Sequence, residues 1–137
     1  MSRITDKIAE IEEYLSELEE FMPNDFEEYL NDIKTKAACE RYFEKITESI
    51  VDIAFLIIKD LGLKIPEDDK VAFDMLAKEK LIPYDTAEKL KNAKGMRNII
   101  AHQYGDVDDE IVFNSITTEI VEDARVFLKN IKKAYKK

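Results

Sequence analysis

The 137 residues fit one domain with one core, and we expect residues 1–137 to form it. The 45% hydrophobic and 37% charged residues are typical of a folded chain, and the net charge of −9 argues against a general nucleic-acid coat protein. There is no apolar run of membrane-spanning length, no secretory segment and only one cysteine, Cys39, so we expect a cytoplasmic protein without an internal disulfide.

Only three glycines and three prolines interrupt the chain, which favours an all-helical fold. Apolar residues spaced four and three apart predict a first helix over residues 3–22, which Pro23 ends. Asp25 and Glu28 resemble a capping box that starts a short helix. A long helix is predicted over residues 32–61, with Gly62 as its stop. Its core stripe is Ile46, Ile50, Ile53 and Ile57.

The second half of the chain continues the helical pattern. After a linker over residues 63–66, Asp68 or Asp69 can cap a helix that runs to about Lys80. Pro83 breaks the chain, and the next helix leads into residues 95–105. A last helix begins in the turn at residues 105–109 and continues to the lysine-rich C-terminus. The sequence therefore predicts an all-α, antiparallel bundle of four long helices joined by short connecting helices.

Residues 86–104, which we call the basic segment, differ in charge from the rest of the chain. Four basic residues, Lys89, Lys91, Lys94 and Arg97, stand against one acid, Glu88, which gives four minus one, or +3, with His neutral. A basic segment in an acidic protein indicates a place where an anion binds.

The basic segment also holds the only histidine, His102. A guanidinium matches a phosphate group, and an imidazole can accept and donate protons near neutral pH, so Arg97 and His102 suffice for a minimal RNA-cleaving centre without metal or cofactor. Asn98 and Lys94 are candidates to contact the phosphate. Tyr104 could contact a phosphate or stack on a base.

The spacing of Arg97 and His102 limits how they can act together. Five residues on a continuous helix place two side chains about 140° apart around the axis, so they do not converge. Either the helix loosens before His102, or the two groups come from different subunits. A purely structural interpretation also stands, in which His102 caps a helix or lies in an interface and Arg97 pairs with Glu48 or Asp52.

Glu48 and Asp52 are four residues apart on the long helix and share one face beside its core stripe. The apolar residues around Asp52 predict that its carboxylate is partly buried and needs a partner, which the basic segment could supply. Both acids are therefore candidates to hold the site residues in position without contacting the substrate themselves.

Arg97-Asn98-x-x-x-His102-x-Tyr104 resembles the Arg-x4-His-x-Tyr signature of the HepT-like toxins within the HEPN superfamily. Residues 48–54, 62–66 and 91–97 resemble the same family. The resemblance implies a homodimeric, metal-independent ribonuclease toxin whose two motifs meet in one cleft. Carried over, Arg97 and His102 are catalytic and Asn98 supports them.

The resemblance also implies a protein partner, a minimal nucleotidyltransferase antitoxin of the MntA type. In the family this partner attaches AMP to the tyrosine that matches Tyr104 and silences the toxin. Added phosphates would bring negative charge into a basic cleft. An alternative is a non-catalytic HEPN protein that docks to a nucleotidyltransferase or binds its substrate, and a helical dimer with purely structural duties is a third. Cleavage by the wild type and not by a folded His102→Ala protein would separate the first interpretation from the other two.

Overall fold

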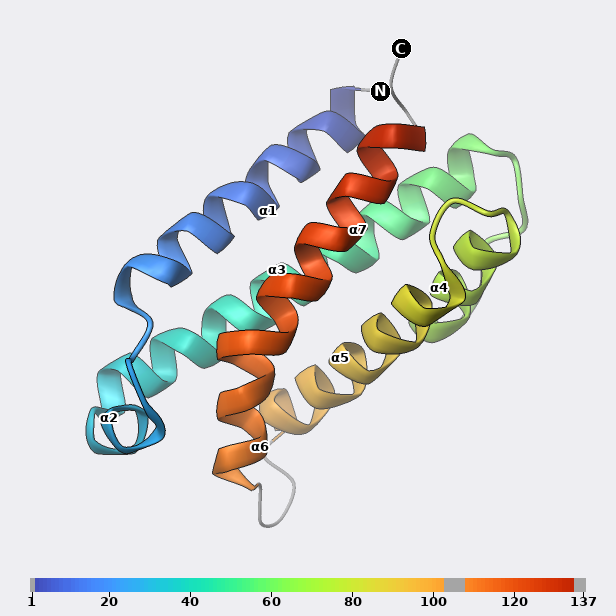
Figure 1. Ribbon diagram of the computed structural model, residues 1–137. Helices are drawn as coiled ribbons and strands as arrows, with labels where there is room; N and C mark the ends of the chain where they lie inside the picture. The colour runs from blue at the N-terminus through green and yellow to red at the C-terminus, as the bar shows by residue number, and fades with distance from the viewer. Residues whose placement is uncertain (1, 103–107, 135–137) are drawn as a thin grey trace.

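The computed structural model describes residues 2–102 and 108–134. Within these ranges the chain is helical throughout, apart from short connections, and contains no strand (Figure 1). The helices in chain order are α1 (Ser2–Phe21), α2 (Phe26–Asn31), α3 (Ile33–Asp60), α4 (Asp69–Lys78), α5 (Tyr84–His102), α6 (Asp109–Asn114), the π-helix η1 (Ser115–Glu119) and α7 (Ile120–Ala134). The predicted all-α bundle is confirmed, with α1, α3, α5 and the α6–α7 rod as its long helices.

Aspartates begin the helices where the sequence predicted starts. The Asp25 carboxylate accepts the backbone N–H of Glu28 at 2.9 Å, and the Glu28 carboxylate accepts the N–H of Asn24, which is a variant of the capping box. Asp32 and Asp68 cap α3 and α4 in the same way. Each cap satisfies backbone donors that have no partner inside the helix.

Two helices end in the same backbone motif but with different residues. At the end of α3, Gly62 adopts a left-handed conformation (φ 73°), and the N–H of Leu63 bonds to the carbonyl of Ile58. At the end of α4, Lys80 takes that position (φ 64°), and the N–H of Leu81 bonds to the carbonyl of Leu76. Glycine is the usual residue here because a Cβ makes this conformation costly, so Lys80 is an exception.

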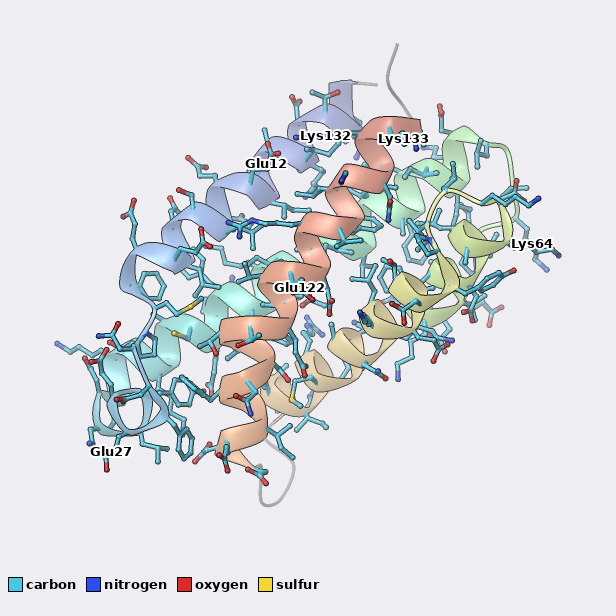
Figure 2. All side chains as sticks on the ribbon, viewed as in Figure 1. Glu12, Glu27, Lys64, Glu122, Lys132 and Lys133 are labelled. Carbon is cyan, nitrogen blue, oxygen red and sulfur yellow. The ribbon has the colours of Figure 1, made fainter. Side chains whose placement is uncertain are left out.

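Helix α3 is the centre of the bundle. It packs against α1, α4, α5 and α7, and Figure 1 shows it running diagonally behind α7. The predicted stripe is buried, with Ile46, Ile50, Ile53 and Ile57 all exposed by no more than 1%. Ion pairs between Arg125 and Glu19 and between Lys132 and Glu12 join α7 to α1 across the outside of the core. Figure 2 labels Lys132 and Glu12.

The final helix is less regular than the sequence indicated. A π-helical turn, Ser115–Glu119, lies between α6 and α7, and the Thr117 hydroxyl donates to the carbonyl of Phe113 at 2.7 Å. Hydroxyl bonds of this kind, four residues back, often bend helices. Ser115 and Ile116, the first two residues of this turn, are buried. Among the described residues, no helix combines the length and the apolar character that a membrane crossing requires.

Candidate active site on helix α5

Helix α5 carries the predicted catalytic residues and is unbroken through His102. The loosening before His102 that would bring the pair together in one chain is absent. Arg97 and His102 therefore point about 140° apart around the axis. Arg97 faces α3, whereas His102 is exposed. Within one chain the structure does not bring the two groups to a common point.

The Arg97 guanidinium is held from two sides. Its Nη2 donates to the Glu48 carboxylate on α3, and its Nη1 donates to Oδ1 of Asn98 at 3.3 Å. The Arg97 side chain is 21% exposed and the Glu48 side chain 45% exposed, so the ion pair lies at the edge of the core rather than inside it. The Nε atom of Arg97 is buried and has no hydrogen-bond partner in the described part of the chain. Glu48 thus fixes the guanidinium while leaving other donors for an anion.

Acidic side chains accompany the cations of the basic segment. The Lys94 ammonium lies 3.0 Å from the Asp69 carboxylate at the start of α4. Lys91 binds both Asp74 and Glu88, and hydrogen bonds to these carboxylates raise its pKa. Lys89 pairs with Asp85.

The basic segment, where the sequence predicts that an anion binds, is not a free cationic surface in the described part of the chain. Carboxylates from α3 and α4 converge on the face of α5 that carries Lys91, Lys94 and Arg97, while Lys89 is matched within α5 itself. Any anion that binds at the basic segment must therefore compete with these acids.

Asp52 has a partner, as the sequence predicts, but the partner does not come from the basic segment. Its side chain is 53% exposed, and its carboxylate pairs with Lys7 of α1 at 3.1 Å rather than with a cation of the basic segment. This contact is the largest cause of a raised Lys7 pKa. Asp52 lies between two residues of the core stripe in sequence, but α1 packs against α3 and places the Lys7 ammonium beside its carboxylate. Only Glu48 of the two candidate acids reaches Arg97.

A hollow of about 390 Å³ opens where α3, α4 and α5 meet. Arg97 and Lys94 line it together with Glu48, Asp52 and Asp69, and Phe55 and Val51 form its apolar part. Asp69 is a site residue that the sequence does not point to. The sequence indicates it only as a possible helix cap, and no spacing rule relates it to Lys94, 25 positions away.

Among the described residues, no three His, Cys, Asp or Glu side chains are grouped closely enough to hold a metal ion. Asn98 lies next to Arg97 and is half-buried. Tyr104, the predicted modification site, lies outside the described residues.

The chain resembles known proteins over most of its length. Residues 11–131 match the family described as Ribonuclease HepT-like. The chain belongs to this family. It is 34% identical over 117 residues to a protein of Archaeoglobus fulgidus whose name gives it as a candidate RNase, covering 83% of this chain and 80% of that one. It is 27% identical over 129 residues to the mRNA nuclease HepT of Shewanella oneidensis, covering 94% and 96%.

A solved structure has the same fold. It contains a tri-AMPylated HEPN toxin of Shewanella oneidensis in complex with an MNT antitoxin, and the toxin superposes with a TM-score of 0.87 at 27% identity, over 95% of this chain and 96% of that one. These matches confirm the predicted family, the HEPN fold and the class of enzyme, a ribonuclease.

Proposed function

We propose that this protein is the toxin of a toxin–antitoxin pair, a metal-independent endoribonuclease that cuts RNA at a site built by two copies of the chain. Membership of the Ribonuclease HepT-like family, with Arg97 and His102 both present on α5, carries the proposal. The relatives named as an mRNA nuclease and as a HEPN toxin bound to its antitoxin support it.

The continuous helix favours a site shared between subunits. One chain offers its guanidinium and its imidazole to different sides of α5, and it contains a single histidine. Cleavage needs a general base for the attacking 2′-hydroxyl and a general acid for the leaving oxygen. A homodimer whose α5 helices face each other would supply two imidazoles and two guanidinium groups to one cleft. We therefore infer that the homodimer is the active form.

In the proposed reaction, the imidazole of His102 removes the proton from the ribose 2′-hydroxyl, and that oxygen attacks the adjacent phosphorus. The bond from phosphorus to the 5′-oxygen breaks, and the second imidazole, in its protonated form, donates a proton to that oxygen. The Arg97 guanidinium, oriented by Glu48 and Asn98, stabilises the added charge on the phosphoryl oxygens. Lys94 can contact a phosphate oxygen if its bond to Asp69 opens.

We further propose that an MntA-type nucleotidyltransferase attaches AMP to Tyr104 and so silences the enzyme. Tyr104 is two positions after His102, so the added phosphates would compete with RNA at the same cations. The intact mass of the protein produced together with the antitoxin tests this. A gain of AMP units that a Tyr104→Phe protein does not show is expected, whereas an unchanged mass with an active partner would contradict it.

Cleavage assays of two variants test the shared site. His102→Ala and Arg97→Ala should each be folded and inactive. An equal mixture of wild-type and His102→Ala chains should keep about a quarter of the wild-type activity, because about a quarter of randomly formed dimers then hold both imidazoles, whereas an independent site in each chain would leave about half. Activity in either single variant equal to wild type would contradict the catalytic assignment.

The Arg97–Glu48 ion pair keeps one alternative open, because such a pair can also be purely structural. In that case the chain is a non-catalytic HEPN protein that docks to its nucleotidyltransferase. Wild-type protein without ribonuclease activity, together with retained binding of the partner, would favour the docking protein.

A further inference from the structure

A groove of about 720 Å³ lies far from Arg97, between the α4–α5 connection and the C-terminal end of α7. Its apolar part includes Leu81 and Pro83, and its polar part consists of Lys80, Tyr84, Asn130 and Lys133. Figure 2 labels Lys133 near the C-terminal end of α7. The proposed function makes no use of these residues.

The charge of the groove is unusual for this chain. The protein contains 30 acidic residues, yet among the residues that the structure describes no acid lines the groove, whereas Glu48, Asp52 and Asp69 line the hollow at Arg97. Within residues 2–102 and 108–134, neither the Lys80 nor the Lys133 ammonium forms an ion pair. Two cations without a matched acid make this groove complementary to an anion.

Lys80 occupies its position against the preference of the backbone. Its φ of 64° belongs to the region that favours glycine, and the equivalent position at the end of α3 is Gly62. A residue held in such a conformation is a reason to look for a function of its side chain. In this conformation Lys80 lines the groove.

Two further groups fit a nucleotide. The Tyr84 side chain is 66% exposed at the start of α5, so its ring offers a surface on which a base can stack. The Nδ2 of Asn130 is buried and has no hydrogen-bond partner in the described ranges, although Asn130 lines the groove. A base or phosphate oxygen is an acceptor for this amide once the Asn130 side chain turns toward the groove, because Nδ2 is covered in its present position.

We propose that this groove binds a nucleotide of single-stranded RNA at a point remote from the cleavage site. Lys80 and Lys133 contact phosphates, Tyr84 stacks on a base, and Asn130 donates a hydrogen bond. The inference rests on the proposed ribonuclease function and adds to it a second contact with the substrate. Tyr84 and Arg97 are thirteen residues apart on α5, or about 20 Å along its axis, so the groove selects RNA long enough to span that distance.

Binding is measured in a His102→Ala background with a labelled single-stranded RNA of about 20 nucleotides, over a series of salt concentrations. Changing Lys80 and Lys133 together to Gln should weaken binding and lower the slope of log Kd against log salt by about 1.4, the value for two lost phosphate contacts. Lys129→Gln is the matched control, because Lys129 lies one turn earlier on α7 and lines a groove that contains Glu12 and Glu19.

Tyr84→Ala should weaken binding at least about five-fold, whereas Tyr84→Phe keeps the ring and should bind like the parent protein. In the active protein, the lysine changes should lower kcat/KM for the long RNA relative to kcat/KM for a dinucleotide, which cannot span from the groove to Arg97.

Unchanged binding of the long RNA in the lysine variants would refute RNA binding by the groove, without affecting the proposed cleavage site. A wild-type protein that neither binds nor cleaves RNA would overturn both proposals. AMP serves as a second probe. If the lysine variants lose AMP binding but keep RNA binding, the groove is a site for free nucleotides and the RNA contact is wrong.

Discussion

Exchanging the residues at the two left-handed helix ends should change stability in opposite directions. Lys80 at the end of α4 and Gly62 at the end of α3 have nearly the same φ and the same pattern of hydrogen bonds. We expect Lys80→Gly to stabilise the protein and Gly62→Lys to destabilise it. The second change isolates the backbone, because a Cβ at Gly62 would meet no atom within 4 Å.

The left-handed conformation costs a residue with a Cβ roughly 1–2 kcal/mol. Glycine gives back about 0.4–1 kcal/mol of this by making the unfolded chain more flexible. The net effect is a change in unfolding free energy of roughly 0.5–1 kcal/mol, or about 2–4 °C in Tm for a chain of this size.

Urea unfolding followed by circular dichroism measures both variants beside the wild type. If Gly62→Lys unfolds at the wild-type urea concentration, the backbone of that motif carries no cost and the reasoning about Lys80 is refuted. A less stable Lys80→Gly protein would show instead that the Lys80 side chain contributes packing that outweighs the strain. With the groove assigned to RNA, Lys80→Gly should be more stable than wild type and bind RNA less tightly.

Three further predictions address the site, helix α5 and pH. Glu48→Gln removes a carboxylate that holds Arg97 and competes with phosphate, so kcat should fall while KM does not rise. The free energy of unfolding should drop by no more than about 1 kcal/mol, because the ion pair is partly exposed. Gly95→Ala should stabilise α5 by about 1 kcal/mol, since the nearest atom to the added Cβ is a lysine ammonium at ordinary contact distance. Burial raises the pKa of the Asp123 carboxyl group, so ionisation of this group disfavours the native state. The Asp123→Asn protein should therefore be more stable than wild type at pH 7. Below about pH 4, where the carboxyl group is protonated, the two proteins should be equally stable. Steady-state kinetics test the first, and urea unfolding tests the others.

Each of these predictions has an outcome that would contradict it. A Glu48→Gln enzyme with unchanged kcat would remove Glu48 from the site. Lower stability of Gly95→Ala would indicate that another chain packs closely against α5 there, and the oligomeric state of the variant would then be measured. An Asp123→Asn protein whose advantage persists at pH 3 would show that the carboxylate is disfavoured for a reason other than its ionisation.

The sequence determined the features that depend on residues close together in the chain. Apolar periodicity and the aspartate caps fixed the helices, because a helix start needs only an acceptor two or three positions before an unpaired N–H. The motif from Arg97 to Tyr104 identified the family in the same local way. The π-helical turn at Ser115–Glu119 is the exception, since no local pattern distinguished it from an ordinary helix.

The pairing of charges was decided only by the tertiary structure. Composition gave the basic segment a surplus of positive charge, but α3 and α4 bring Glu48, Asp69 and Asp74 against it from positions distant in sequence. Asp52 lies on the same face of α3 as Glu48, four residues later, yet the packing of α1 against α3 pairs its carboxylate with Lys7 instead. Ion pairs form between groups within a few ångströms of each other, and how helices pack sets those distances, whereas local sequence sets only which side of a helix each group is on.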